Sequence, residues 1–192
     1  MPRRPGRPRS AELDAAILDA ALDLLIDRGV GETSIEQVAG RAGVTRATVY
    51  RRFPDKIQLL IAAIHREHGT EELPSEPVDV EEMLAWWAEA LSKPRLRRLT
   101  RRLMSSLHDY PALREAYWNA SIKHREQLVR STLEQAYREG RFPPETDLEI
   151  VQKILSGAVS YHLAAHPDTC TKEEVEEFLL AVVRQTGLRA RS

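Results

Sequence analysis

The side chains best suited to bind an anionic polymer lie between Thr33 and Lys56. Residues 43–54 contain three arginines and no acidic residue, and threonine and tyrosine hydroxyls lie among the arginines. At DNA, arginine forks onto guanine O6 and N7, hydroxyls reach phosphate oxygens, and a small methyl lies against the thymine methyl. A charge run alone is more often a solvated face, so the elements that carry these side chains decide the interpretation.

Two short helices joined by a tight turn are predicted to position these side chains. Thr33 and Glu36 have the Thr-x-x-Glu spacing of a capping box, which predicts the start of the first helix. Gly43 stands where a left-handed C-cap is needed, and Thr45 can cap a second helix that reaches Phe53. Apolar residues recur at helical spacing in the first helix, at Ile35, Val38, Ala39 and Ala42. This order is typical of a helix-turn-helix.

A specific set of residues repeats the spacing of one known family: Thr33-Ser34, Val38-Ala39, Ala42-Gly43-Val44, Thr45, Thr48-Val49-Tyr50, Phe53, Lys56 and Leu59-Leu60. Through them the chain resembles the tetracycline-repressor family of bacterial transcription regulators. Gly40 departs from the family pattern, in which a longer polar residue is more usual. The resemblance implies a homodimer whose last two long helices form a four-helix interface, and a body that holds a small-molecule inducer.

Eleven residues are expected at a double-stranded DNA operator. We expect Thr45, Thr48, Tyr50 and Lys56 at phosphates, Arg46 and Ala47 at base edges, Arg51 and Arg52 on a basic rim, and Ser34, Arg7 and Arg9 beside them. Arg7 and Arg9 belong to an arm, residues 1–9, that is too rich in proline, glycine and arginine to pack. Its Pro-Gly-Arg-Pro core is similar to an AT-hook, which enters an A·T minor groove, and a solubilising tail fits equally well.

Composition predicts an all-α protein and excludes several classes. Apolar residues make up 42% of the 192 residues and aromatic residues 6%, and the formal net charge is −1. Positive charge is concentrated near the motif, because residues 33–56 hold five basic and two acidic residues, whereas residues 70–192 hold 17 basic and 20 acidic ones. Cys170 is the single cysteine, and no apolar run is long enough to span a bilayer, so we expect a cytoplasmic protein without a membrane anchor or leader peptide.

Proline, glycine and helix-capping residues mark the expected boundaries of domains and helices along the chain. We expect a disordered basic arm at 1–9, a helix-turn-helix DNA-binding domain at 10–68, and a ligand-binding and dimerisation domain at 79–192. The first domain is predicted to hold four helices, at 10–28, 33–42, 45–53 and 55–68. The second is predicted to hold five, at 79–92, from 94 to about 107, and at 111–140, 147–167 and 171–187. The total is nine.

The ligand-binding and dimerisation domain, expected at residues 79–192, supplies candidate ligand and dimer residues. A pocket for a flat or apolar effector could use Trp86, Trp87, Leu103, Leu107, Tyr110, Tyr117, Trp118, His124, Tyr161 and His162, although core packing explains any single aromatic residue as well. The family's four-helix interface implies contacts from Val151, Leu155, Ala158, Phe178, Leu179 and Val182. Small residues such as Gly157 independently let helices approach closely there.

The remaining features favour a regulator over an enzyme. No phosphate loop, metalloprotease signature or nucleophile elbow is present, and we expect no catalytic residue and no cofactor. Two histidine pairs, His65/His68 and His162/His166, lack a third ligand, so we expect no metal site. One helix carries five arginines, and we interpret them as a solvated or salt-bridged face: residues 95, 97, 98, 101 and 102. The alternative is that this helix couples the C-terminal domain to the DNA-binding domain. The rival functions are an architectural DNA-binding protein and a helical ligand carrier or enzyme that retains the DNA-binding domain.

Overall fold

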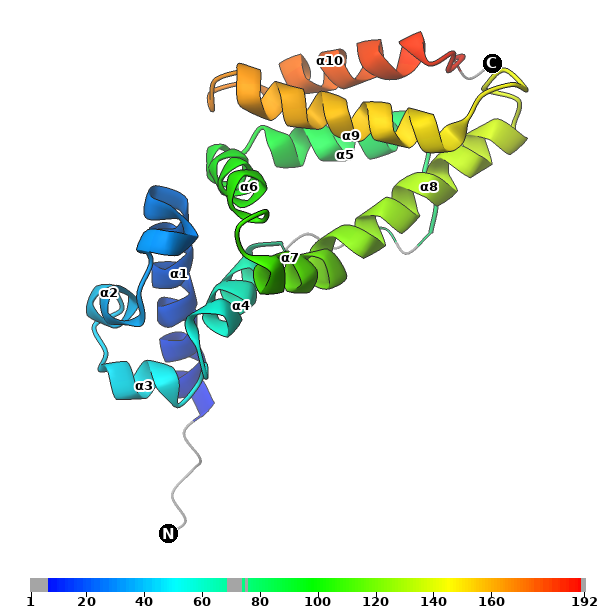
Figure 1. The fold of residues 1–192 in the computed structure, drawn as a ribbon. Coiled ribbons are helices and arrows are strands. Elements are labelled where there is room, and N and C mark those ends of the chain that lie inside the picture. Colours follow the sequence, from blue (N-terminus) through cyan, green and yellow to red (C-terminus); the bar gives the residue numbers. More distant parts are fainter. Residues whose placement is uncertain (1–6, 69–73, 75, 191–192) are drawn as a thin grey trace. The chain divides into compact units, whose positions relative to one another are not determined.

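The computed structural model describes residues 7–68, 74 and 76–190, and within these ranges the regular structure is entirely helical (Figure 1). The predicted all-α class is therefore confirmed. The chain forms two compact units. The first comprises Met1–Glu72 with Arg102–Ser121, and the second Leu73–Arg101 with Ile122–Ser192. The helix α6 (Pro94–Ser106) passes from one unit into the other.

The first unit packs α1 (Arg7–Glu32), α2 (Ile35–Arg41), α3 (Arg46–Tyr50), α4 (Lys56–His68) and α7 (Pro111–Tyr117) around a small core. α1 contacts α2 and α4, α2 contacts α3, and α4 contacts α7. The core side chains are at most 1% exposed: Ile17, Ala21, Leu25, Val38, Val49, Leu59, Leu60, Ile64 and Leu113. Burial of such branched side chains contributes roughly 1.5 to 3 kcal/mol each, which ties the short α3 to the longer helices.

The predicted bounds of the first helices need two corrections. α1 begins at Arg7, three residues before the predicted Ser10. The capping box of α2 belongs to Ser34 and Gln37, because Gln37 N donates to Ser34 Oγ over 3.2 Å and Ser34 N donates to Gln37 Oε1 over 3.0 Å. Thr33, predicted to open that box, is 1% exposed and donates its hydroxyl to the Gly29 carbonyl over 2.7 Å.

The second unit is built from α5 (Val80–Leu91), the first part of α6, α8 (Lys123–Arg138), α9 (Leu148–Ala165) and α10 (Lys172–Gln185). α10 packs on both α5 and α9, and α8 packs on both α5 and α9 (Figure 1). One hydrophobic core joins these four helices. The predicted caps form as expected: Asp79 accepts from Glu81 N, Asp147 from Glu149 N, and Thr171 and Glu174 make a capping box.

The predicted single helix over 111–140 is interrupted. A π-helical turn, η1 (Trp118–Ile122), separates α7 from α8. A π-turn carries i→i+5 hydrogen bonds and marks a local insertion in an α-helix, which sequence periodicity does not reveal. The described ranges therefore hold ten α-helices and one π-helix rather than nine helices. None of the helices described is both long and apolar enough to cross a membrane.

Candidate nucleic-acid interface

The turn before α3 fixes the helix on which most of the DNA-binding residues were predicted. Gly43 has φ +67°, its N–H donates to Gly40 O over 3.3 Å, and Val44 N donates to Ala39 O over 2.9 Å. Together these bonds form a Schellman motif that closes α2. At the start of α3, the Thr45 hydroxyl accepts from Thr48 N over 3.2 Å. Both ends of the turn are thus held by hydrogen bonds.

Burial then decides which side chains of α3 face outward. Val49 is completely buried, whereas Arg46 and Ala47 are exposed and Tyr50 is 51% exposed. Arg51 follows as an exposed C-cap. α3 ends at Tyr50, short of the predicted 53. Arg52 N and Phe53 N both donate to Val49 O over 2.9 Å, so the regular α-helical pattern ends before Pro54, which cannot continue the helix. The exposed group has the composition of a surface that contacts base edges and phosphates.

A carboxylate that sequence reasoning missed lies beside this group. Arg46 Nη1 donates to Glu36 Oε1 over 2.9 Å, with both side chains more than half exposed. The hydrogen bond from Arg46 is the main reason that the pKa of Glu36 is lowered, with a smaller contribution from backbone hydrogen bonding. An exposed pair of this kind is worth little in water, so Arg46 can exchange it for a phosphate or a base.

Two predicted DNA contacts are used inside the protein. Arg52, which is 17% exposed, forms an ion pair with Asp14 of α1 and donates to Thr48 O over 3.3 Å. Lys56 Nζ donates to the Val30 carbonyl over 2.9 Å. These contacts brace α3 and α4 against α1, a structural role that spacing alone did not reveal. Phosphate contact by Lys56, and the place of Arg52 on a basic rim at the DNA, stay predictions.

The other predicted DNA-binding residues are placed only in part. Ser34 is the N-cap of α2, so its hydroxyl is occupied by a backbone N–H. Arg7 and Arg9 have helical backbone in α1, and their side chains lie outside the described residues. The rest of the predicted arm, residues 1–6, also lies outside them.

The arginine-rich α6 has in part the predicted solvated or salt-bridged face, but one of its arginines is buried. Arg97 is 0% exposed and donates to the carbonyls of Leu91, His162 and His166 over 3.1 to 3.3 Å. Arg101 pairs with Asp168 over 2.7 Å. Arg97 thus ties the start of α6 to the end of α9. From the sequence alone, Arg97 could not be distinguished from the other four arginines of this helix.

The ten predicted ligand residues are divided between the two units. Five belong to the first unit and five to the second. Leu103 and Tyr117 are buried, Leu107 and Tyr110 are half-buried, and Trp118 is 45% exposed. In the second unit Trp86 and Trp87 are half-buried, His124 is exposed, Tyr161 is 62% exposed, and His162 is 2% exposed. The buried Leu103, Tyr117 and His162 agree with the core-packing alternative, whereas Trp118, His124 and Tyr161 do not. Ligand contact by any of the ten stays a prediction.

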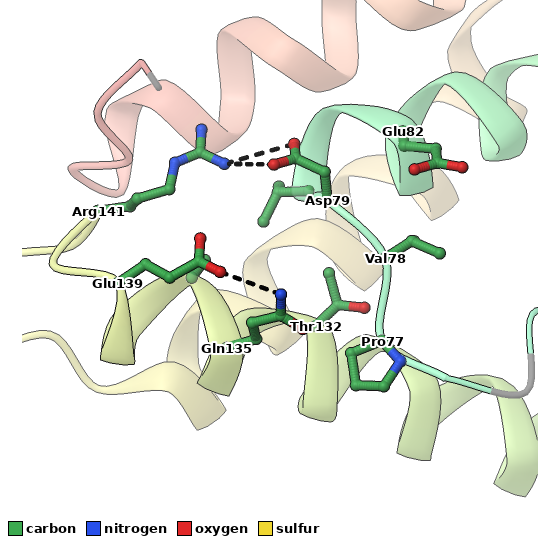
Figure 2. A pocket seen from close by; sticks show the side chains of 10 residues that line it. Pro77, Val78, Asp79, Glu82, Thr132, Gln135, Glu139 and Arg141 are labelled. Carbon is green, nitrogen blue, oxygen red and sulfur yellow. Dashed lines mark hydrogen bonds and ion pairs between the residues drawn. The ribbon is translucent and has the colours of Figure 1, made fainter. Parts of the chain in front are cut away.

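Two pockets of the second unit differ from the predicted set. One, of about 550 Å³, lies where α9 ends and α10 begins, and His162 is the predicted residue that lines it, with Phe178 and Glu174 opposite. The other, of about 280 Å³, lies between the residues that lead into α5 and the last turns of α8 (Figure 2). Polar residues line much of the second pocket, so its lining lacked the aromatic signal used to search the sequence.

Known protein families account for both halves of the chain. Residues 17–63 match "Bacterial regulatory proteins, tetR family", and residues 77–182 match "Tetracyclin repressor-like, C-terminal domain". The chain belongs to the tetracycline-repressor (TetR) family of transcriptional regulators. The predicted family and bacterial helix-turn-helix class are confirmed, and this family is not one of enzymes.

Individual relatives of this TetR-family regulator are distant in sequence. An uncharacterized HTH-type transcriptional regulator of Bacillus subtilis, YdeS, is 24% identical over 197 residues, covering 100% of this chain and 98% of YdeS. SrpR of Pseudomonas putida is 26% identical over 151 residues, covering 75% of this chain and 70% of SrpR.

Solved structures show the same fold. The repressor MexZ of Pseudomonas aeruginosa has a TM-score of 0.70 at 23% identity, covering 93% of this chain and 99% of MexZ. NalD, a repressor of a multidrug efflux pump in the same organism, has a TM-score of 0.70 at 25% identity, covering 96% of this chain and 100% of NalD.

Three of the six predicted dimer residues of this TetR-family regulator are buried in the core. Val151, Leu155 and Leu179 are at most 3% exposed within the single chain, whereas Ala158, Phe178 and Val182 are half-buried. Three large side chains that were not among the predicted dimer residues are exposed on α9: Ile150 at 48%, Ile154 at 43% and Tyr161 at 62%. Their spacing of four and seven residues puts them on one face of the helix. That spacing was readable from the sequence, but burial was needed to tell it from the core stripe one residue away.

Proposed function

We propose that this chain is a homodimeric repressor that binds a palindromic operator and releases it when a small molecule binds the C-terminal half. The observation that carries the proposal is the exposed set Arg46, Ala47 and Tyr50 on a helix held by the Schellman turn and the Thr45 cap. Residues 10–68 would contact DNA, and residues 79–192 would hold the effector and the partner. Repression is supported by MexZ and NalD, which are named as repressors.

Two copies are needed for a physical reason. One short helix contacts only a few base pairs, whereas a two-fold dimer presents two such helices roughly 34 Å or a multiple apart, which matches a palindrome. The exposed face formed by Ile150, Ile154 and Tyr161 supports α9 as part of the partner contact, since contiguous exposed apolar surface is typical of interfaces. Effector binding would favour a dimer whose two α3 helices no longer match successive major grooves. A coupling free energy of about 1 to 3 kcal/mol between effector and operator binding would lower operator affinity about 5- to 150-fold.

Footprinting of the DNA upstream of its own gene and of neighbouring genes tests the proposal. We expect one protected palindrome, bound at least ~10³-fold more tightly than random DNA. A smaller ratio would favour an architectural protein. Arg46→Ala should weaken operator binding by roughly 1 to 3 kcal/mol and relax specificity at one position of each half-site. Arg130→Ala is the matched control, because Arg130 also forms an exposed ion pair, with Glu134 over 2.9 Å, but lies on α8 of the other unit.

The experiment that tests for a small-molecule effector uses the same operator fragment. Compounds are screened for release of the fragment, and any active compound is then titrated against protein without DNA. An effector must bind both ways, and the ratio of its affinities for free and DNA-bound protein must equal the ratio of the two operator affinities, since coupling is reciprocal. A compound that releases DNA without this equality acts on the DNA and not on the protein.

A further inference from the structure

We propose that the 280 Å³ pocket between the Pro77–Glu82 segment and α8 binds a short aliphatic ammonium ion, such as a diamine. The pocket lies wholly within the second unit. Its volume is at the low end of ligand pockets, so its ligand must be small. Three observations carry the assignment: a buried hydroxyl without a partner, an excess of carboxylates, and an apolar stretch beside them.

The hydroxyl belongs to Thr132. This side chain is 1% exposed, and its Oγ1 has no hydrogen-bond partner among the described residues. The neighbouring Ser131 bonds the Leu128 carbonyl over 2.9 Å, which is the usual solution for a hydroxyl inside a helix. In Figure 2 the Thr132 side chain projects from α8 toward Pro77 and Val78. A buried polar group left unpaired destabilises the folded protein, and a ligand that bonds it would remove that cost.

The charges that line the pocket are unbalanced. Arg141 is the one cation among the described lining residues, and its guanidinium bonds Asp79 (Figure 2). It also bonds Glu81 and the Arg189 carbonyl, so its charge is already neutralised. The bond to Glu81 is the main reason that the pKa of Arg141 is raised, so the charge of Arg141 is permanent.

Two further carboxylates lie on the same pocket without a cation. Glu139 accepts a hydrogen bond from the Gln135 amide over 3.0 Å, and Glu82 on α5 makes no hydrogen bond or ion pair with the described residues. Acceptors therefore outnumber donors here, and a positively charged donor is the complementary ligand.

The rest of the lining favours an organic cation over a metal ion. Pro77, Val78 and Ala136 present apolar atoms to the same space. A methylene chain can pack on them while its ammonium group bonds the carboxylates. In the described part of the chain no group of three or more His, Cys, Asp or Glu side chains is arranged to hold a metal. An alkylammonium ion satisfies both the apolar and the acidic part of the lining.

Direct binding to the full-length protein, without DNA, tests the site. Isothermal titration with 1,4-diaminobutane is compared with 1,4-butanediol, which has the same chain without charge, and with sodium chloride at matched ionic strength. We expect saturable binding of one diamine per chain and no binding of the diol. Equal heats from diamine and diol, or no saturable diamine binding, would overturn the proposal.

Three variants locate the site. Thr132→Val replaces the hydroxyl by a methyl of similar size, and Glu82→Gln removes a charge from the α5 side. Each should weaken diamine binding at least ~10-fold. Glu134→Gln is the matched control, because Glu134 is exposed on α8 but does not line the pocket, and it should bind as the wild type does. Loss of binding in this control would mean non-specific attraction and would overturn the assignment.

The thermal stability of Thr132→Val separates a ligand role from a structural one. The variant should unfold at the same temperature as the wild type or higher, because the unpaired hydroxyl is gone. A variant that binds diamine normally would overturn the proposal. Only the effect of the diamine on operator affinity rests on the proposed function, so diamine binding without any DNA binding would contradict the repressor and leave the site standing.

Discussion

Arg46 Nη1 on α3 donates a 2.9 Å hydrogen bond to Oε1 of Glu36 on α2, so the arginine expected at base edges is held by a carboxylate of the preceding helix. The bond orients Arg46 before any DNA arrives. It also competes with DNA, because a phosphate or base must displace Glu36 and tolerate its charge.

Neutralising that carboxylate should strengthen DNA binding. Glu36→Gln keeps a hydrogen-bond acceptor for Arg46 and removes one negative charge, so we expect operator affinity to rise about two- to fivefold, with a larger gain for random DNA. Fluorescence anisotropy on an operator and on a scrambled fragment measures both. Glu115→Gln, at an exposed position of α7, is the control and should change neither affinity. Weaker binding by Glu36→Gln would mean that Glu36 orients Arg46 more than it competes.

Removal of the buried Arg97 should destabilise the fold strongly. Arg97→Met keeps a long side chain but removes the guanidinium that donates to the carbonyls of Leu91, His162 and His166. Breaking a buried charged network of this kind costs roughly 3 to 5 kcal/mol. Urea unfolding followed by circular dichroism measures the loss. Arg98→Met, the neighbouring exposed position, should stay within about 0.5 kcal/mol of the wild type, and similar losses in both variants would contradict the buried role.

His162 should make stability depend on pH. Burial, and then the nearby His166 and Arg97, lower the pKa of His162 below the ordinary 6.5, against a smaller opposite effect of Glu174. The folded state therefore keeps His162 neutral. Its stabilising contribution is complete above pH 6.5 and is lost as the pH falls below 6.5 toward the lowered pKa of the folded state, because the unfolded chain then binds the extra proton.

The pH effect is measured as a slope. This one group can contribute at most about 1.4 kcal/mol per pH unit to the fall in unfolding free energy below pH 6.5. Urea unfolding at a series of pH values should show a shallower fall for His162→Gln than for the wild type. The exposed His124→Gln serves as the control. Equal slopes in all three proteins would show that His162 is not the group responsible.

A charge on the exposed face of α9 should dissociate the proposed dimer. Ile154→Glu places a carboxylate where we expect partner contact, so the dimer dissociation constant should rise at least ~10-fold. Light scattering after gel filtration measures the mass, and circular dichroism checks that the helices remain. Met104→Glu alters a similarly exposed apolar residue, 46% against 43%, on α6 and should leave the mass unchanged. An unchanged mass for Ile154→Glu would place the interface elsewhere.

Local hydrogen bonding made much of the fold predictable. Helices are capped or closed where the residue types indicated, at Gly43, Thr45, Asp79, Asp147 and the pair Thr171 and Glu174, because a cap needs only neighbours two to five residues away. The same local logic was wrong at Thr33, since a hydroxyl can bond back to a carbonyl four residues earlier as readily as forward, and burial against α1 selects the former.

The sequence by itself determined the helix-turn-helix, the exposed face of α3 and the family, because these depend on residues that are close together along the chain. Tertiary structure decided what long side chains do. Arg52 reaches Asp14, Lys56 reaches the Val30 carbonyl, and Arg97 is buried against the end of α9, across separations of 26 to 69 residues. Arginine and lysine have several flexible bonds and similar signatures whether solvated, paired or buried. Only the packing of distant helices selects among those states.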